Sequence, residues 1–321
     1  MKGDVQFLAS DLLEGRGTPS RGLDVAAAYI ASQFQAAWLK PIHGDSYLQT
    51  RKFPDGSKAS NVIGILPGSD PELAKTYIVV SSHYDHLGMK PEGHGGDRIY
   101  NGANDDASGS ASVLGIARAL SAISPRPKRS IVFITFFGEE KGFWGSTFYM
   151  EHPVVPLQQT IADINLEQVG RTDAPEGPLI RKAQVTGFEF SDIGKTLRAA
   201  GAQTGIEVLD DHRDDTFERS DNFPFAKHGI PAHTVGVAWE YPDYHDVGDD
   251  WQKLDYVNMA KVDEMIAEAV LLMANNPERP KWLKKFTPRE EFPTASDPES
   301  GSSPAIPPAP QSKPSAKPKA H

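Results

Sequence analysis

Short runs of apolar, often β-branched residues recur along the first three quarters of the chain. Their lengths of about six to eight residues, and the turn residues between them, are typical of buried strands. The strongest run, at residues 130–137, reads Ser-Ile-Val-Phe-Ile-Thr-Phe-Phe. Together these runs predict strands at residues 61–66, 76–82, 130–137, 160–166 and 230–237.

Other segments repeat their hydrophobic residues every three to four positions, which places those residues on one face of a helix. In residues 21–40, Val25, Phe34 and Trp38 follow this spacing, with alanines between them. The pattern predicts helices at residues 21–40, 108–121, 190–204 and 256–275. Strands that alternate with helices indicate βαβ units, so we expect an α/β fold with a largely parallel sheet.

The composition changes near residue 287. Residues 293–321 hold eight of the 26 prolines, much Ser and Ala, and one large apolar residue, Ile306. Such a segment cannot bury enough apolar surface to offset the entropy lost on ordering. We therefore predict one folded domain at residues 1–286 and a disordered Pro/Ser/Ala-rich tail at residues 287–321. A Pro-rich partner ligand or a linker is the less favoured reading of the tail.

Composition and charge exclude several classes of protein. The chain has 321 residues and no Cys, so neither a disulfide framework nor a thiolate metal site can form. The 33 Lys and Arg against 43 Asp and Glu give a net charge of −10, and the body has no Lys/Arg-rich block. This balance argues against a nucleic-acid partner or an anionic membrane surface, since both require a positive patch. No apolar stretch of roughly 18 residues predicts a membrane span.

Histidines and acidic residues gather directly after three of the predicted strands, ahead of one predicted helix, and in one later loop. In open parallel sheets ligands bind beyond the carboxyl ends of the strands, so we expect these groups to meet. Singly, each motif is more typical of a helix cap, a turn or a structural histidine. Carboxylates brought together repel one another unless a cation neutralises them, and two imidazoles with three carboxylates suit zinc or another borderline divalent metal. The motifs are Ser82-His83-Tyr84-Asp85-His86, Asn104-Asp105-Asp106, Gly138-Glu139-Glu140, Asn165-Leu166-Glu167 and Tyr244-His245-Asp246.

These motifs resemble, in order, those of the twenty-eighth metallopeptidase family, which includes bacterial leucyl aminopeptidases. The resemblance spans roughly residues 5 to 275 and is far more specific than any single short motif. It rests on HYDHLG at 83–88, NGANDDASG at 101–109 and GEEKGFWGS at 138–146, with LASD at 8–11, EGR at 14–16, INLE at 164–167, GIPA at 229–232 and YH at 244–245.

The resemblance implies the zinc exopeptidase fold, a three-layer α/β/α sandwich with a mixed, mostly parallel central sheet. Between Asn61 and His83 the sequence has room only for a short pair of strands. The protease-associated domain that some relatives insert there is therefore absent. The resemblance also implies two Zn²⁺ ions per chain, bridged by Asp105. One ion is expected to bind His83 and Glu140, and the other Glu167 and His245.

The family pattern further implies three catalytic roles. Glu139 is the expected general base, and Asp85 is expected to orient the His83 imidazole, as metal-bound histidines usually require. Tyr244 resembles the tyrosine that stabilises the tetrahedral oxyanion. The main departure is Glu167, where aminopeptidases of this type mostly carry Asp. Asp106 and His86 are expected to have capping or supporting roles.

The expected activity is therefore that of a zinc-dependent exopeptidase acting on peptide substrates, with an aminopeptidase favoured. A carboxypeptidase or dipeptidase on the same site and a glutaminyl cyclase-like single-zinc acyltransferase are the alternatives, and a non-catalytic binding module is the least favoured. No signal-peptide pattern is visible at the start of the chain. Relatives with this amino-terminal stretch are commonly exported. The resemblance therefore implies a periplasmic or extracellular protein if Met1 is an internal Met of a longer precursor that carries a signal peptide. If Met1 is the true start, we expect a cytoplasmic protein.

Overall fold

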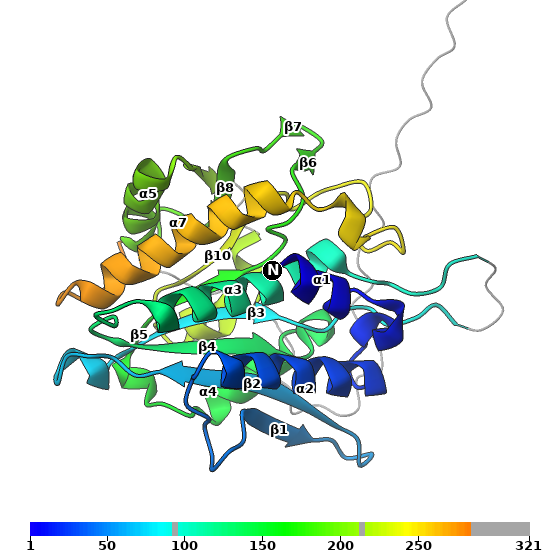
Figure 1. Ribbon diagram of the computed structural model, residues 1–321, viewed down its shortest axis with the longest axis horizontal. Coiled ribbons are helices and arrows are strands. Elements are labelled where there is room, and N and C mark those ends of the chain that lie inside the picture. Colours follow the sequence, from blue (N-terminus) through cyan, green and yellow to red (C-terminus); the bar gives the residue numbers. More distant parts are fainter. Residues whose placement is uncertain (92–95, 212–215, 284–321) are drawn as a thin grey trace, which may run out of the picture. The chain divides into compact units, whose positions relative to one another are not determined.

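A computed structural model describes residues 1–91, 96–211 and 216–283. These residues form an eight-stranded sheet in the order β1-β2-β4-β3-β5-β10-β8-β9, flanked by helices (Figure 1). The tail predicted at residues 287–321, and the boundary before it, lie outside the described residues. The sheet strands are β1 (Leu48–Lys52), β2 (Lys58–Leu66), β3 (Tyr77–His83), β4 (Ser130–Phe136), β5 (Thr160–Leu166), β8 (Lys182–Thr186), β9 (Glu207–Asp211) and β10 (Ala232–Gly236). The helices are α1 (Lys2–Leu8), α2 (Arg21–Ala36), α3 (Gly109–Ala122), α4 (Trp144–Glu151), α5 (Ile193–Thr204), α6 (Asn222–Lys227) and α7 (Tyr256–Asn275), and β6 (Asp173–Ala174) pairs with β7 (Gly177–Pro178).

Four neighbouring strands at the centre of the sheet, β4, β3, β5 and β10, run parallel to one another. On one side of them, β2 is antiparallel to β4 and β1 is antiparallel to β2; on the other, β8 is antiparallel to β10 and β9 is parallel to β8. The sheet is therefore mixed and mostly parallel, as predicted. Because the four central strands are parallel, their carboxyl ends lie at one edge of the sheet, which we call the carboxyl edge.

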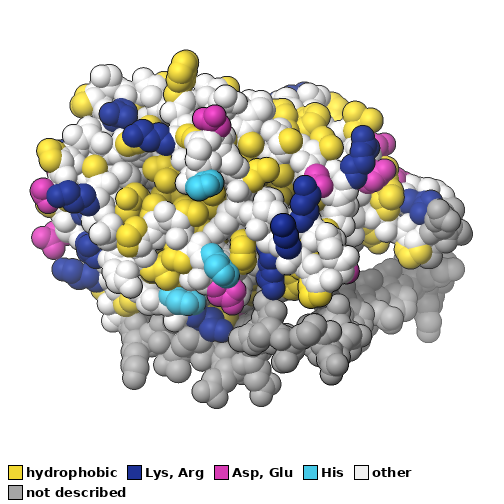
Figure 2. Space-filling view, turned by 90° about the horizontal axis from the view of Figure 1, so that it is seen from below, with side chains coloured by type: hydrophobic (Ala, Val, Ile, Leu, Met, Phe, Trp, Pro, Cys, Tyr) yellow, Lys and Arg dark blue, Asp and Glu magenta, His cyan; other side chains and the backbone are white. Residues whose placement is uncertain are grey.

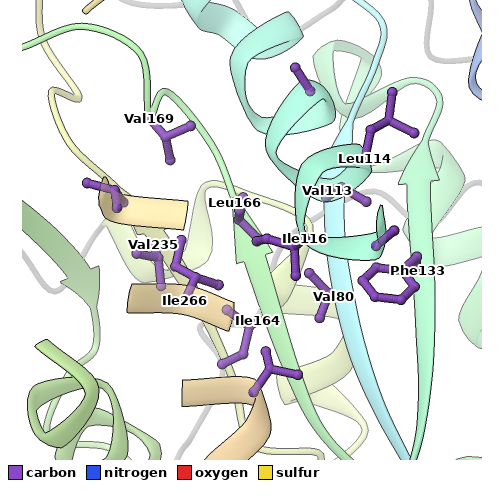
Figure 3. Packing of buried hydrophobic residues seen from close by; sticks show 14 of the residues in the cluster. Val80, Val113, Leu114, Ile116, Phe133, Ile164, Leu166, Val169, Val235 and Ile266 are labelled. Carbon is purple, nitrogen blue, oxygen red and sulfur yellow. The ribbon is translucent and has the colours of Figure 1, made fainter. Parts of the chain in front are cut away.

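The central strands are buried on both faces, which explains their continuous apolar sequences. In β3, Ile78 and Val80 belong to the large core on one face, while Val79 belongs to the smaller core on the other. Figure 3 shows Val80 and Ile164 beside Ile116 of α3 and Ile266 of α7 in the large core. Helices α2, α3 and α7 cover that face, and α4 and α6 pack on the opposite one, so the domain has the three expected layers (Figure 1).

The helix predicted at residues 21–40 ends earlier than expected, at Ala36. Trp38 has a φ of +58° and is 90% exposed, so its predicted place on the buried face is wrong. The chain turns here because Lys40 already pairs with Ile65 at the end of β2. Pairing with the sheet therefore overrides the helical periodicity in the last few residues.

Within the described ranges, no helix is both long and apolar enough to cross a membrane. The face seen in Figure 2 carries Lys and Arg side chains interspersed with acidic, histidine and hydrophobic ones.

Candidate functional site

The predicted motifs meet at the carboxyl edge. His83 is the last residue of β3, and Glu167 directly follows β5. After β4, Gly138 turns the chain with a φ of +69°, and Glu139 and Glu140 begin a short 3₁₀ turn. His245 comes from the loop after β10. Parallel neighbouring strands thus bring residues more than 80 positions apart to one place.

Asp105 lies at the middle of this cluster, in the segment Ala103–Ser108 that leads into α3. Its Oδ1 is 3.2 Å from Nε2 of His83, and its Oδ2 is 3.0 Å from Nε2 of His245. Asp105 is 2% exposed and His83 is fully buried, whereas the side chain of His245 is 21% exposed. One carboxylate thus faces two different imidazoles, one with each oxygen.

The possible metal ligands fall into two groups that share Asp105. One atom each from His83, Asp105 and Glu167 lies within 4.8 Å of the others, so the longer side chain of Glu167 reaches this group. The second group is His86, Asp105 and Glu140, and Oε2 of Glu140 also lies 3.5 Å from Nε2 of His245. We use the term metal centre for the five predicted ligand residues: His83, Asp105, Glu140, Glu167 and His245.

The predicted pairing of the ligands is wrong. The sequence resemblance placed His83 with Glu140 and Glu167 with His245, whereas the structure places His83 with Glu167 and His245 with Glu140. β10 is the neighbour of β5, yet His245 reaches the acid that follows β4. The loop after β10 therefore crosses the carboxyl edge, a path that strand order alone does not reveal.

His86 supports the second group. Its Nδ1 lies 2.9 Å from Oε1 of Glu140, and its ring contacts the His245 ring at a centroid distance of 5.8 Å. One ligand atom of His86 also lies within 4.8 Å of the ligand atoms of Asp105 and Glu140. The sequence analysis gave His86 only a supporting role; its contact with Glu140 suits that role, and its grouping with Asp105 and Glu140 also makes it a candidate ligand.

Two buried imidazole nitrogens in this cluster are available to bind a cation. Nε2 of His83 and Nε2 of His86 are buried and make no hydrogen bond to any described residue. A buried polar atom without a hydrogen-bond partner lowers the stability of the fold. A bound metal ion would remove this cost, because a neutral imidazole nitrogen is a common zinc ligand. Carboxylate and imidazole donors without thiolates suit zinc, so the residues present fit a metal.

Asp85 lies where the resemblance placed it. Its Oδ1 is 3.5 Å from Nδ1 of His83 and accepts the backbone N–H of Glu139 at 3.1 Å. Its Oδ2 accepts the hydroxyl of Thr18 at 3.0 Å. Asp85 therefore contacts a metal-centre imidazole and the backbone of the predicted general base together, which suits an orienting role.

Charge is unbalanced in the metal centre. Burial raises the pKa of Glu139 well above its usual range, and the charges of Glu167 and Glu140 add to the rise while His83 opposes it. Burial alone would lower the pKa of His245, but its contact with Asp105 outweighs this and raises it to about 9. The acids outnumber the imidazoles, so the cluster takes up protons or another cation.

The loop that carries Tyr244 and His245 is held at its far end by Asp249, which the sequence analysis did not single out. The carboxylate of Asp249 is fully buried and accepts backbone N–H groups from Asn104, at 2.9 Å, and Asp105, at 3.1 Å. His245 itself has a φ of +54°, and its ring stacks on Tyr244 at a centroid distance of 4.0 Å. Asp249 thus ties the loop to the shared ligand.

A second clamp holds the same loop to the segment after β5. Arg171 donates to Asp243 at 2.9 Å and to Asp173 at 2.7 Å, and Lys253 lies 3.0 Å from the other oxygen of Asp243. Since Arg171 follows Glu167 by four residues, this clamp connects the loop of His245 to the strand end of Glu167. No sequence signal distinguishes Arg171 or Asp249 from ordinary surface charges.

Curated proteins similar to this chain come from bacteria, fungi and a plant. Aminopeptidase YwaD of Bacillus subtilis is 26% identical over 237 residues, which cover 71% of this chain and 47% of the relative. A probable zinc metalloprotease of Pyrenophora tritici-repentis is 26% identical over 326 residues, covering 86% of this chain and 73% of the relative. The chain thus spans about half the length of the Bacillus protein.

Solved structures share the fold. LapA aminopeptidase of Legionella pneumophila superposes with a TM-score of 0.65 at 21% identity, covering 87% of this chain and 73% of LapA. Glutaminyl cyclase of Porphyromonas gingivalis gives a TM-score of 0.63 at 19% identity, covering 84% of this chain and 96% of the cyclase. A sequence model of one peptidase family matches residues 61–270, which include the whole metal centre. The chain therefore belongs to peptidase family M28.

Proposed function

We propose that this chain is a zinc-dependent exopeptidase with two metal ions, and that it acts as an aminopeptidase on peptide substrates. The observation that carries the proposal is the position of Asp105, whose two oxygens face two separate groups of ligands. A carboxylate placed in this way is suited to bridge two cations. Relatives named as an aminopeptidase and a zinc metalloprotease support the choice of metal and of reaction.

Each ion would have its own ligands in addition to Asp105. His83 and Glu167 would hold one ion, and Glu140 and His245 the other, with His86 bonded to Glu140. When bound, the pair of ions supplies Lewis acidity at neutral pH.

Two side chains beside the metal centre would move or hold protons. Glu139 would take a proton from the attacking water and pass it to the leaving amine. The hydrogen bond from the backbone N–H of Glu139 to Asp85 fixes the position of the Glu139 backbone, from which this side chain extends. Burial, with the charge of Asp105 next, raises the pKa of Tyr244 well above its usual range, so its hydroxyl keeps its proton. That hydroxyl can donate to the oxyanion that forms on the scissile carbonyl.

The polar groups around the metal centre suit a substrate amine better than a substrate carboxylate. Two Zn²⁺ ions would neutralise the three ligand carboxylates and Glu139, but carboxylate oxygens beside the ions would still accept hydrogen bonds from an ammonium group such as a free peptide amino terminus. Three basic side chains near the centre are already engaged: Arg16 with four carbonyl oxygens, Arg171 with two carboxylates, and Lys253 with Asp243. This arrangement supports trimming from the amino terminus.

Zinc content measured by elemental analysis tests the two-metal proposal. The wild type is expected to hold about two zinc ions per chain. His245→Ala and Glu167→Gln should each reduce this to about one, because each removes a ligand of one ion, and Asp105→Ala should lose both. His43→Ala is the matched control, since His43 is exposed and far from these ligands in the chain, and it should keep two. One zinc in the wild type would instead favour the single-zinc cyclase alternative.

Paired substrates test the choice of exopeptidase. Aminoacyl chromogenic substrates and short peptides with a free amino terminus should be cleaved, and the same peptides acetylated at the amino terminus should not. Cleavage of the acetylated peptides from their carboxyl end would establish a carboxypeptidase and refute the proposal. Pyroglutamate formation from an amino-terminal Gln without peptide cleavage would establish the cyclase alternative.

A further inference from the structure

Arg16 has a fully buried side chain and is neither a predicted metal ligand nor a predicted catalytic residue. It is 0% exposed, in the segment that follows α1. Its guanidinium donates to the carbonyl oxygens of Tyr84, at 2.7 Å, Asn101, at 2.7 Å, and Gly102, at 2.9 Å, and also to that of Leu8. A planar guanidinium with five N–H donors can hold several carbonyls in fixed directions at once.

Two of these carbonyls belong to the loops that carry metal-centre residues. Tyr84 lies between His83 and Asp85, and Gly102 precedes Asp105 by three residues. Arg16 therefore connects the backbone at the end of β3 to the backbone that leads into α3. Ser110 of α3 adds one further connection, since its hydroxyl donates to the carbonyl oxygen of His83 at 2.7 Å.

The neighbours of Arg16 join the same two loops. Thr18 donates its hydroxyl to Asp85 at 3.0 Å, and the backbone N–H of Gly88 donates to the carbonyl of Gly15 at 3.0 Å. Gly15 has a φ of +68°, and a Cβ there would lie 2.2 Å from the carbonyl oxygen of Gly88. The segment thus fits closely against the loop that follows His83.

The charge of Arg16 also acts on the metal centre. Burial lowers its pKa to about 10, while Asp85, Asp106 and Asp249 oppose that change, so the side chain remains charged at neutral pH. Its four hydrogen bonds all go to neutral carbonyl oxygens. The positive charge therefore remains available to offset repulsion among the nearby carboxylates before a metal binds.

The family resemblance includes Glu14-Gly15-Arg16 but implies no role for it, and the family model matches only residues 61–270. We propose that Arg16 and Thr18 are positioning residues of the metal centre: Arg16 holds the backbones of the loops of His83 and Asp105, and Thr18 holds the Asp85 carboxylate against His83. The inference rests on the proposed zinc site and adds to it a support from the amino-terminal part of the chain. Neither residue touches substrate.

Arg129 provides a matched control for Arg16. It is 1% exposed and donates to the carbonyl oxygens of Asn276, at 2.9 Å, and Pro277, at 2.8 Å. It directly precedes β4, at the opposite end of that strand from Glu139, and seven strand residues span roughly 20 Å. Both arginines are buried among carbonyls, but only Arg16 bonds to the loops of the metal centre.

The experiment compares zinc affinity with stability in Arg16→Lys, Arg129→Lys and wild type. Zinc dissociation constants come from competition with a chromophoric chelator, and the unfolding free energy of each zinc-free protein comes from urea denaturation. Arg16→Lys should weaken zinc binding about 10- to 100-fold, as loss of supporting contacts does elsewhere, whereas Arg129→Lys should change it less than about threefold. Lys keeps the charge but not the planar fork, so the effect isolates positioning.

Thr18→Val keeps the test decisive if Arg16→Lys does not fold, because it removes one hydroxyl and preserves side-chain volume. It should weaken zinc binding about tenfold with little change in stability. Zinc affinities of the Arg16 and Thr18 variants equal to those of wild type and the control would overturn the inference and leave the proposed function standing. Absence of zinc binding in the wild type would overturn both.

Discussion

Replacing Asp263 by Asn should stabilise the protein, and the gain should grow with pH. Asp263 lies in α7 against α3 and is 6% exposed. Both of its carboxylate oxygens are buried and make no hydrogen bond to a described residue. Burial raises its pKa from 3.8 to about 7, against the opposing effects of Ser112 and of the amino terminus.

The magnitude follows from this shift. Between pH 3.8 and about 7 the native protein binds a proton that the unfolded chain has lost, so the unfolding free energy falls as pH rises through this window. Each pKa unit is worth about 1.4 kcal/mol, so the ionised carboxylate costs about 4 kcal/mol at pH 8. Asn has nearly the same shape and stays neutral, so the variant avoids this cost. The stability difference should therefore grow by about 2.5 kcal/mol between pH 5 and pH 8.

Urea denaturation of the zinc-free full chain at pH 5, 6, 7 and 8 measures this difference. Subtracting the wild type at each pH cancels the titration of every group that the two proteins share. Glu264→Gln is the control, because Glu264 is the next residue on α7, its side chain is 54% exposed and it contacts Lys261 at the surface. Its difference from wild type should stay within about 0.5 kcal/mol at all four values. A pH-independent difference for Asp263→Asn would refute the reasoning.

Three further substitutions test the site and the fold. Glu139→Gln should lower kcat about 10²- to 10⁴-fold while elemental analysis finds the zinc content unchanged, and a kcat within about tenfold of wild type would exclude the general-base role. Tyr244→Phe should lower kcat about 10²-fold with little change in KM in steady-state assays, and an equal loss confined to KM would contradict oxyanion stabilisation. Gly22→Ala should lower the unfolding free energy by about 2–4 kcal/mol in urea titrations, because the new Cβ would lie 1.7 Å from the carbonyl oxygen of Leu13. Gly3→Ala, with nothing within 4 Å of the new Cβ, should cause no comparable loss.

The central strands could be predicted from sequence because they are buried on both faces. The runs at residues 130–137 and 160–166 differ from the observed β4 and β5 by at most one residue. β1, β8 and β9 were not predicted, since they lie toward the edges of the sheet and carry polar residues at exposed or partly exposed positions. β9, Glu-Val-Leu-Asp-Asp, contains three acids, which local propensity assigns to a turn.

The site shows a similar division. Motif resemblance predicted which residue types gather at the carboxyl edge, and the five predicted ligand residues do lie together there. The pairing of the ligands depends on how the loop after β10 runs, and no local pattern encodes that path. Arg16 and Asp249 form hydrogen bonds to backbone groups 85 and 145 residues away in the sequence. Any residue type can supply a backbone group, so the sequence around these partners does not reveal the contacts.

The crossing of the loop after β10 has a consequence for how the site arises during synthesis. The loop brings His245 to Glu140 and Asp249 to Asn104, so the ligand set joins early and late parts of the chain. A nascent chain that ends before residue 245 contains His83, Asp105 and Glu140 but lacks the imidazole that completes the second group. The full set of ligands can assemble only once the last strand has emerged from the ribosome and joined the sheet. Binding of the second ion would therefore report that the loop after β10 is in place, whereas a chain that ends before residue 245 would still contain His83, Asp105 and Glu167 of the first group.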